Sequence, residues 1–169
     1  MLKTLRRSAD TRALAWRLCA ELVAQARRPE FFTALAVPDT LDGRFDLVAL
    51  HGWLVLDSVR KQPALSRALI DEVFLQFEEA LRHLGTGDAG MNRRLKTLAG
   101  MFYGRLDAYR NAATPNEMSK AIQRNVFRGA GEREPQASAL AAYIMAARSR
   151  LAERDPARQP LDFGPVPTM

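Results

Sequence analysis

Three glycines in one segment reproduce the spacing of a dinucleotide-binding fingerprint. Gly85, Gly87 and Gly90 spell G-x-G-x-x-G, and Asp107 follows about twenty residues later, where an acidic residue would bind a ribose hydroxyl. In that fingerprint a buried strand precedes the glycines, so that they turn tightly onto a helix N-terminus. The residues before Gly85, FEEALRHL, have a helical pattern instead. The glycines therefore favour a linker between two helices over a nucleotide site.

Metal ligation has equally little support. His51 and His83 lie far apart, and neither has a second histidine three or four residues away. The aspartates of the 39–46 segment lack the spacing of a calcium loop, whose bidentate glutamate would fall on Leu50. Capping and turn hydrogen bonds explain these carboxylates more simply. We expect no metal site and no bound cofactor.

Nucleophilic catalysis needs a cysteine or serine beside a histidine that a carboxylate orients. No local signature of this kind occurs, and Cys19 falls beside the apolar face of a helical segment, where a small buried side chain is usual. We therefore predict no catalytic residue and a protein that is not an enzyme. The least supported alternative is an unrecognised site that combines the polar loop 38–46 with His51 and Trp53.

Basic residues suggest a second class of function. The net charge is +6, the first residues 1–9 form a basic arm, and Arg93, Arg94 and Lys96 form a basic patch near the start of another predicted helix. Such basic groups could bind RNA, the ribosome or anionic lipid. The sequence contains no recognised helix-turn-helix and no clear set of stacking aromatics, so we expect no specific DNA binding. A peripheral RNA- or ribosome-associated helical module is our alternative hypothesis.

Apolar residues recur at helical spacing through most of the chain. We expect helices at about 10–28, 29–35, 45–60, 63–84, 88–109 and 115–126, with a polar loop at 37–46. After a polar break at 129–135, a last helix should run through Leu140, Ile144, Ala147 and Leu151. The 45–60 segment is apolar on nearly every side, which is typical of a central buried helix. Thr114, Pro115 and Glu117 match a capping box, the clearest helix start in the chain.

Length and composition indicate one globular domain. The 169 residues are 47% apolar and 26% charged, which is the ordinary balance of a folded protein. We predict an all-α fold, a single compact bundle of about six to seven helices over 1–155, followed by a Pro-rich tail at 156–169. The single cysteine excludes an internal disulfide, and the uncharged run 47–56 is about half of the ~20 residues that a membrane span needs. Because no signal-peptide core is present, we expect a cytoplasmic protein.

Four segments, taken in order, resemble the ubiquinol-cytochrome c chaperone family. They are VPDTLDGRFDLVALHGWLVL, the helix ending in LRHLGTGDAG, MNRRLKTLAGMFYGRLDAY, and LAAYIMAARSRL. The PDT-x-x-G-x-F element with the following LHxWL is the most specific part. The resemblance runs from about Leu14 to the tail, and it is the main reason for expecting a particular function.

The resemblance implies a helical chaperone that binds newly made cytochrome b, or another subunit of the bc1 complex, and supports assembly of that complex. It implies a position in the cytoplasm, peripheral at the inner face of the membrane. Mitochondrial members act with a small partner protein at the ribosome and have longer N-terminal regions than this sequence. The family motifs suggest client contacts at Pro38, Asp39, Thr40, Gly43, Phe45, His51, Trp53, Phe102, Tyr103, Arg105 and Tyr109.

Overall fold

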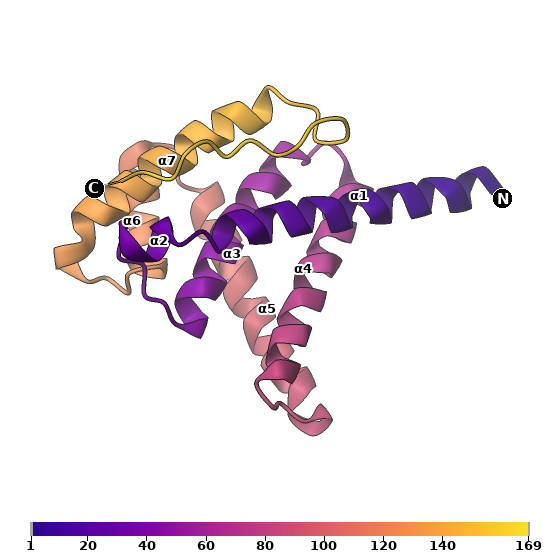
Figure 1. Cartoon of the computed structure of the whole chain (residues 1–169), viewed down its shortest axis with the longest axis horizontal. Coiled ribbons are helices and arrows are strands. Elements are labelled where there is room, and N and C mark those ends of the chain that lie inside the picture. Colours follow the sequence, from indigo (N-terminus) through magenta and orange to yellow (C-terminus); the bar gives the residue numbers. More distant parts are fainter. Residues whose placement is uncertain (1, 169) are drawn as a thin grey trace.

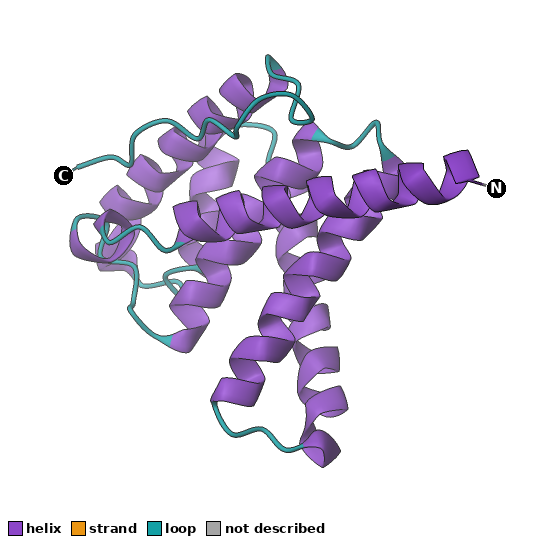
Figure 2. Cartoon of the chain, turned by 45° about the vertical axis from the view of Figure 1, so that its right-hand side comes forward, coloured by secondary structure: helices purple, strands orange, loops and turns teal. Residues whose placement is uncertain are grey.

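The computed structural model describes residues 2–168, with side chains described for residues 8–87 and 90–168. Its regular elements over these residues are helices, which confirms the predicted all-α bundle (Figures 1 and 2). They are α1 (Leu2–Ala26), α2 (Glu30–Thr33), α3 (Leu41–Ser58), α4 (Pro63–His83), α5 (Asp88–Arg110), α6 (Pro115–Asn125), a 3-10 turn (Gly131–Arg133) and α7 (Glu134–Ala152).

Helix α3 is the centre of the bundle. Its side chains are buried on nearly every face from Phe45 to Val55, as a sequence that is apolar on nearly every side predicts. Helices α1, α5 and α7 pack around it, α4 lies along α1, and α6 packs on α7. Burying a large apolar side chain such as Leu50 contributes about 2 kcal/mol, so this helix supplies much of the stability of the fold.

Two side-chain caps define helix starts. The Thr114 hydroxyl accepts a hydrogen bond from the Glu117 amide at 3.2 Å, and the Glu117 carboxylate accepts one from the Thr114 amide at 2.9 Å, which confirms the predicted capping box. The Thr40 hydroxyl accepts a hydrogen bond from the Gly43 amide at 3.1 Å. This cap starts α3 at Leu41. The prediction of a loop at 37–46 was therefore wrong for residues 41–46, which are helical.

Two other helices begin earlier than their patterns predict. Helix α1 starts at Leu2 and not near Asp10, because its polar first turns consist largely of residues with good helix propensity. Helix α7 starts at Glu134, where Pro135 occupies a first-turn position that needs no amide donor. The glycines near residue 85 do link two helices, and Gly85 ends α4 at a φ of 77°.

Two features extend from the central packing. Helices α4 and α5 form a hairpin whose tip points away from the other helices (Figures 1 and 2). The C-terminal tail has no helix between residues 153 and 168 and runs back beside α7 toward the α2 and α6 end of the molecule (Figure 1). The Leu161 amide donates to Glu21 at 2.7 Å, and the ring of buried Phe163 lies 5.4 Å from that of His51. The tail is therefore part of the packed structure.

Candidate functional site

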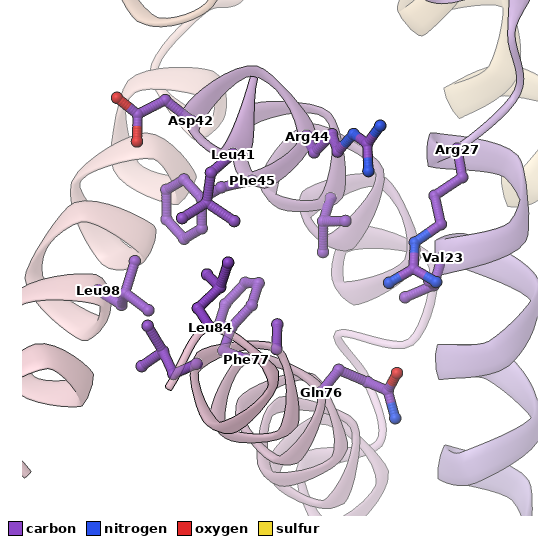
Figure 3. A pocket seen from close by; sticks show the side chains of 13 residues that line it. Val23, Arg27, Leu41, Asp42, Arg44, Phe45, Gln76, Phe77, Leu84 and Leu98 are labelled. Carbon is purple, nitrogen blue, oxygen red and sulfur yellow. The ribbon is translucent and has the colours of Figure 1, made fainter. Parts of the chain in front are cut away.

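An apolar groove of about 370 Å³ opens where α3 meets the α4–α5 hairpin and the end of α1 (Figure 3). Leu41 and Leu84 lie at this groove with exposed fractions of 54% and 58%, although large apolar side chains are elsewhere mostly buried. The apolar lining comprises Val23, Leu41, Phe45, Val48, Phe77, Ala80, Leu81, Leu84 and Leu98, and the polar lining comprises Arg27, Asp42, Arg44 and Gln76. Apolar grooves with a polar rim are typical of protein-binding surfaces.

The PDT-x-x-G-x-F element builds one wall of the groove. Thr40 caps α3, and the chain approaches so closely there that a Cβ at Gly43 would lie 2.0 Å from the Pro38 carbonyl oxygen. Only glycine fits this approach. The turn directs Phe45 into the groove, where its ring lies 5.1 Å from that of Phe77. Thr40, Gly43 and Pro38 thus act by positioning the start of α3.

Cations lie at the α1 end of the groove. Arg44 Nε donates to Asp39 Oδ1 at 2.7 Å, and this contact lowers the pKa of the exposed Asp39 carboxyl. Arg27 also lines the groove and forms no ion pair with any residue whose side chain is described. Both guanidinium groups also border a second hollow of about 320 Å³ that reaches Phe32. Arg27 and Arg44 therefore separate an apolar compartment from a more polar one.

A buried ionic cluster supports Phe45 from behind. Arg105 Nε donates to Asp46 Oδ1 at 2.6 Å, and the Arg105 guanidinium lies 4.9 Å from the centre of the Phe45 ring. Arg128 Nη1 lies 2.8 Å from Asp46 Oδ2, an ion pair whose angles fall short of a hydrogen bond. Burial raises the pKa of Asp46 more than the two arginines lower it. The cluster joins α3 to α5 and to the end of α6.

Several residues expected from the family motifs are enclosed in the core. His51 is fully buried, and burial lowers its pKa to about 4. Its Nδ1 lies 2.8 Å from the Leu47 carbonyl oxygen and its Nε2 lies 3.1 Å from the Tyr143 hydroxyl. The exposed Asp39 lies in a different environment, so the polar loop and His51 share no pocket. This arrangement gives no support to the enzyme alternative.

The remaining motif aromatics divide between the core and another surface. Trp53, Phe102 and Tyr109 are 3%, 0% and 0% exposed, and Phe102 packs beneath Phe77 of the groove at 6.0 Å. Tyr103 is 47% exposed and lies beside Phe74, outside the groove. Of the predicted client contacts, the structure therefore places Phe45 in the groove and Asp39 at the second hollow.

The sequence-based site missed the walls that α1, α4 and α5 contribute. Phe77, Leu81 and Leu84 belong to the apolar stripe of α4, which indicated core packing alone. One signal was present, because the stripe continues to the last turn beside Gly85, beyond the packed body. Val23 and Leu98 come from other helices, and their meeting with α4 depends on tertiary packing.

The basic patch lies elsewhere on α5. Arg93, Arg94 and Lys96 are exposed, and Arg94 Nη1 donates to the Thr86 hydroxyl at 2.7 Å. They do not line the apolar groove, and their binding to RNA stays a prediction. Among the described residues, no three histidine, cysteine or acidic side chains are grouped to hold a metal ion. Within the same residues, no helix combines the length and hydropathy required to cross a bilayer.

Comparisons with known proteins identify the family. A family model described as ubiquinol-cytochrome C chaperone matches residues 33–158, which include α3 to α7 and exclude α1 and all but the last residue of α2. The crystal structure of the Cbp3 homolog from Brucella abortus is similar, with a TM-score of 0.77 and 35% sequence identity over 92% of this chain and 90% of that chain. Among curated proteins, none matches the sequence. The family match and the shared fold agree with the resemblance carried by the PDT-x-x-G-x-F element, and the chain therefore belongs to the ubiquinol-cytochrome c chaperone family.

Proposed function

We propose that this protein is an assembly chaperone of the bc1 complex, and that it holds newly made cytochrome b in the groove between α1, α3, α4 and α5. Family membership supports the class of function. The observation that supports this location for the binding site is the exposure of Leu41 and Leu84 at an apolar groove with a polar rim. The role is one of holding, and it requires no catalytic group.

The groove suits part of an apolar helix. Unassembled membrane helices expose apolar side chains that aggregate in water, and covering them removes that surface from solvent. A hollow of about 370 Å³ takes a few large side chains and not a whole helix. Binding then follows the helix-in-groove mode, in which side chains three and four residues apart insert as anchors. The client's other faces remain available to further subunits or to lipid.

We place the protein at the inner face of the cytoplasmic membrane, because cytochrome b is a membrane subunit. The alternative, an RNA- or ribosome-associated module, is favoured by the exposed Arg93, Arg94 and Lys96. It requires binding that weakens steeply with salt. Ribosome sedimentation at two salt concentrations separates the alternatives, since salt-insensitive migration apart from ribosomes removes the second one.

The test compares glutamate substitutions at three similarly exposed leucines. Leu41→Glu and Leu84→Glu place a charge at the groove, whereas Leu75→Glu changes a residue of α4 that is 54% exposed and does not line it. Each tagged variant is produced in a strain that lacks the natural gene, and cytochrome b is measured in pull-downs from detergent-solubilised membranes.

We expect Leu41→Glu and Leu84→Glu to retain less than a fifth of the cytochrome b, while Leu75→Glu retains the normal amount. Thermal unfolding of the purified variants controls for folding. Normal capture by both groove variants would refute the groove as the binding site. Unchanged bc1 levels in the deletion strain would refute the assembly function itself.

A further inference from the structure

We infer that the groove binds the C-terminal end of an apolar helix, with a carboxylate at that end held between Arg27 and Arg44. This inference rests on the proposed function and specifies which part of a client the site recognises. It follows from the unequal composition of the two ends of the groove.

One end of the groove is apolar. Figure 3 shows Leu41, Phe45, Phe77, Leu84 and Leu98 gathered on the side away from α1. These side chains come from three helices and face a common space. An apolar helix face placed there loses contact with water at about 25 cal/mol for each Å² buried. This end accepts the membrane-embedded part of a client, and its charged neighbour Asp42 points away from the centre of the groove.

The opposite end is cationic. Figure 3 shows Arg27 and Arg44 on the α1 side of the groove, while the Asp42 carboxylate points away from its centre. Asp42 Oδ2 lies 3.9 Å from Arg128 Nη2. Arg44 Nε donates a hydrogen bond to Asp39, and the terminal nitrogens of Arg44 have no hydrogen-bond or ion-pair partner among the side chains that the structure describes. Arg27 has no ion-pair partner in the same part of the chain, so both guanidiniums retain donors for an anion.

The second hollow continues from the groove beyond the two arginines, and it offers a path for the client residues that follow the bound helix. It begins at the same two arginines and is lined by Pro29, Phe32, Thr33 and Asp39. A helix that lies in the apolar compartment therefore ends at the arginines, and the following residues continue over a more polar surface. The negative end of a helix dipole is its C-terminus, which favours this direction near cations. Lysine or arginine at that position would be repelled.

The test uses one labelled apolar helical peptide in mild detergent, made with glutamate, glutamine or lysine directly after its apolar stretch. Fluorescence anisotropy gives the affinity for the full-length protein and for Arg27→Gln, Arg44→Gln and a control, Arg110→Gln. Arg110 is exposed at the far end of α5. A fourth peptide has its glutamate before the apolar stretch instead of after it.

We expect the C-terminal glutamate peptide to bind three- to tenfold more tightly than the glutamine peptide and the lysine peptide to bind more weakly than both. The preference for glutamate should shrink in Arg27→Gln and Arg44→Gln, weaken with salt, and persist in Arg110→Gln. Affinity for the glutamine peptide should stay constant in Arg110→Gln and should fall less than affinity for the glutamate peptide in Arg27→Gln and Arg44→Gln, where only the helix dipole loses its cations. Equal binding of the three peptides, or a preference for the N-terminal glutamate, would overturn this inference and leave the proposed function standing. Failure of every peptide to bind would overturn both.

Discussion

Asp46 and Arg105 form an ion pair inside the core, with Arg105 Nε 2.6 Å from Asp46 Oδ1 and the two side chains 0% and 10% exposed. The pair links α3 to α5 directly behind Phe45. Removing water from two charges is costly, and each charge offsets that cost only while its partner is present. The pair therefore makes the position of the groove wall depend on both helices.

Asp46→Ala should lower the free energy of unfolding by about 3 kcal/mol, because it leaves the Arg105 charge nearly buried. Chemical denaturation measures this loss. In the double variant Asp46→Ala/Arg105→Met the orphaned charge is gone, so the loss should be smaller than the sum of the two single losses. Strict additivity would show that the two side chains are not coupled.

His51 should make the protein sensitive to mild acid. Its pKa is about 4 when folded, because burial disfavours the charged ring, and about 6.5 when unfolded. Above pH 6.5 the ring is neutral in both states. Between pH 6.5 and 4 the unfolded state takes up a proton first, so stability should fall in that window, by on the order of 3 kcal/mol in total.

The control for this pH dependence is His51→Phe, which keeps an aromatic ring beside Phe31 and Phe163. Tyr143 retains the hydrogen bond that Gln25 Nε2 donates at 2.9 Å. Urea denaturation at several pH values should give a flatter profile for the variant between pH 6.5 and 4. The same slope in both proteins would assign the acid sensitivity to other groups.

Gly43→Ala should disturb the start of α3, because the new methyl group would lie 2.0 Å from the Pro38 carbonyl oxygen. We expect a loss of about 2 kcal/mol in the free energy of unfolding and weaker client capture. Gly104→Ala is the matched control, since the residue is inside α5 and a Cβ added there would meet no side chain or other element within 4 Å. That change should stabilise the protein by about 0.5–1 kcal/mol. Equal effects at both sites would contradict the close approach.

Thr114→Ala should lower the thermal stability by removing the cap of α6. The hydroxyl satisfies the Glu117 amide, and the loss of such a cap costs about 1 kcal/mol. Thr97→Ala is a suitable control, because Thr97 donates to the Arg93 carbonyl within α5 and caps nothing. Calorimetry should show a lower Tm for the first variant and an unchanged or slightly higher Tm for the second.

Most of the fold could be predicted from local patterns. Helix α3 was identified as the buried centre because apolar residues surround it, and α6 because a capping box and Pro115 coincide. The start of α3 was placed too late, because Thr40 and its neighbours are also typical of turns and only the hydrogen bond to Gly43 decides between the two. The early start of α1 was missed because Lys3, Arg6 and Arg7 made residues 1–9 look like a separate basic arm.

The candidate site was harder to predict than the fold. Phe45 and Trp53 look alike in the sequence, since both are aromatic residues in family motifs, yet Phe45 lines the groove and Trp53 lies under Arg148 in the core. Leu84 lies in the LRHLGTGDAG segment but was not among the predicted client contacts, and it is one of the most exposed leucines. What separates these residues is the angle at which the α4–α5 hairpin leaves the body (Figure 2), and that angle is a property of long-range packing.

The C-terminal tail has a consequence for how acid tolerance varies among related proteins. Phe163 shields the imidazole of His51 from water, yet it lies beyond residue 158, where the family match stops. The water-free surroundings of this central histidine are thus completed by a residue that lies outside the matched segment 33–158. Relatives that have a histidine at this position but a different sequence after the matched segment should show a different histidine pKa, even where their helices superimpose.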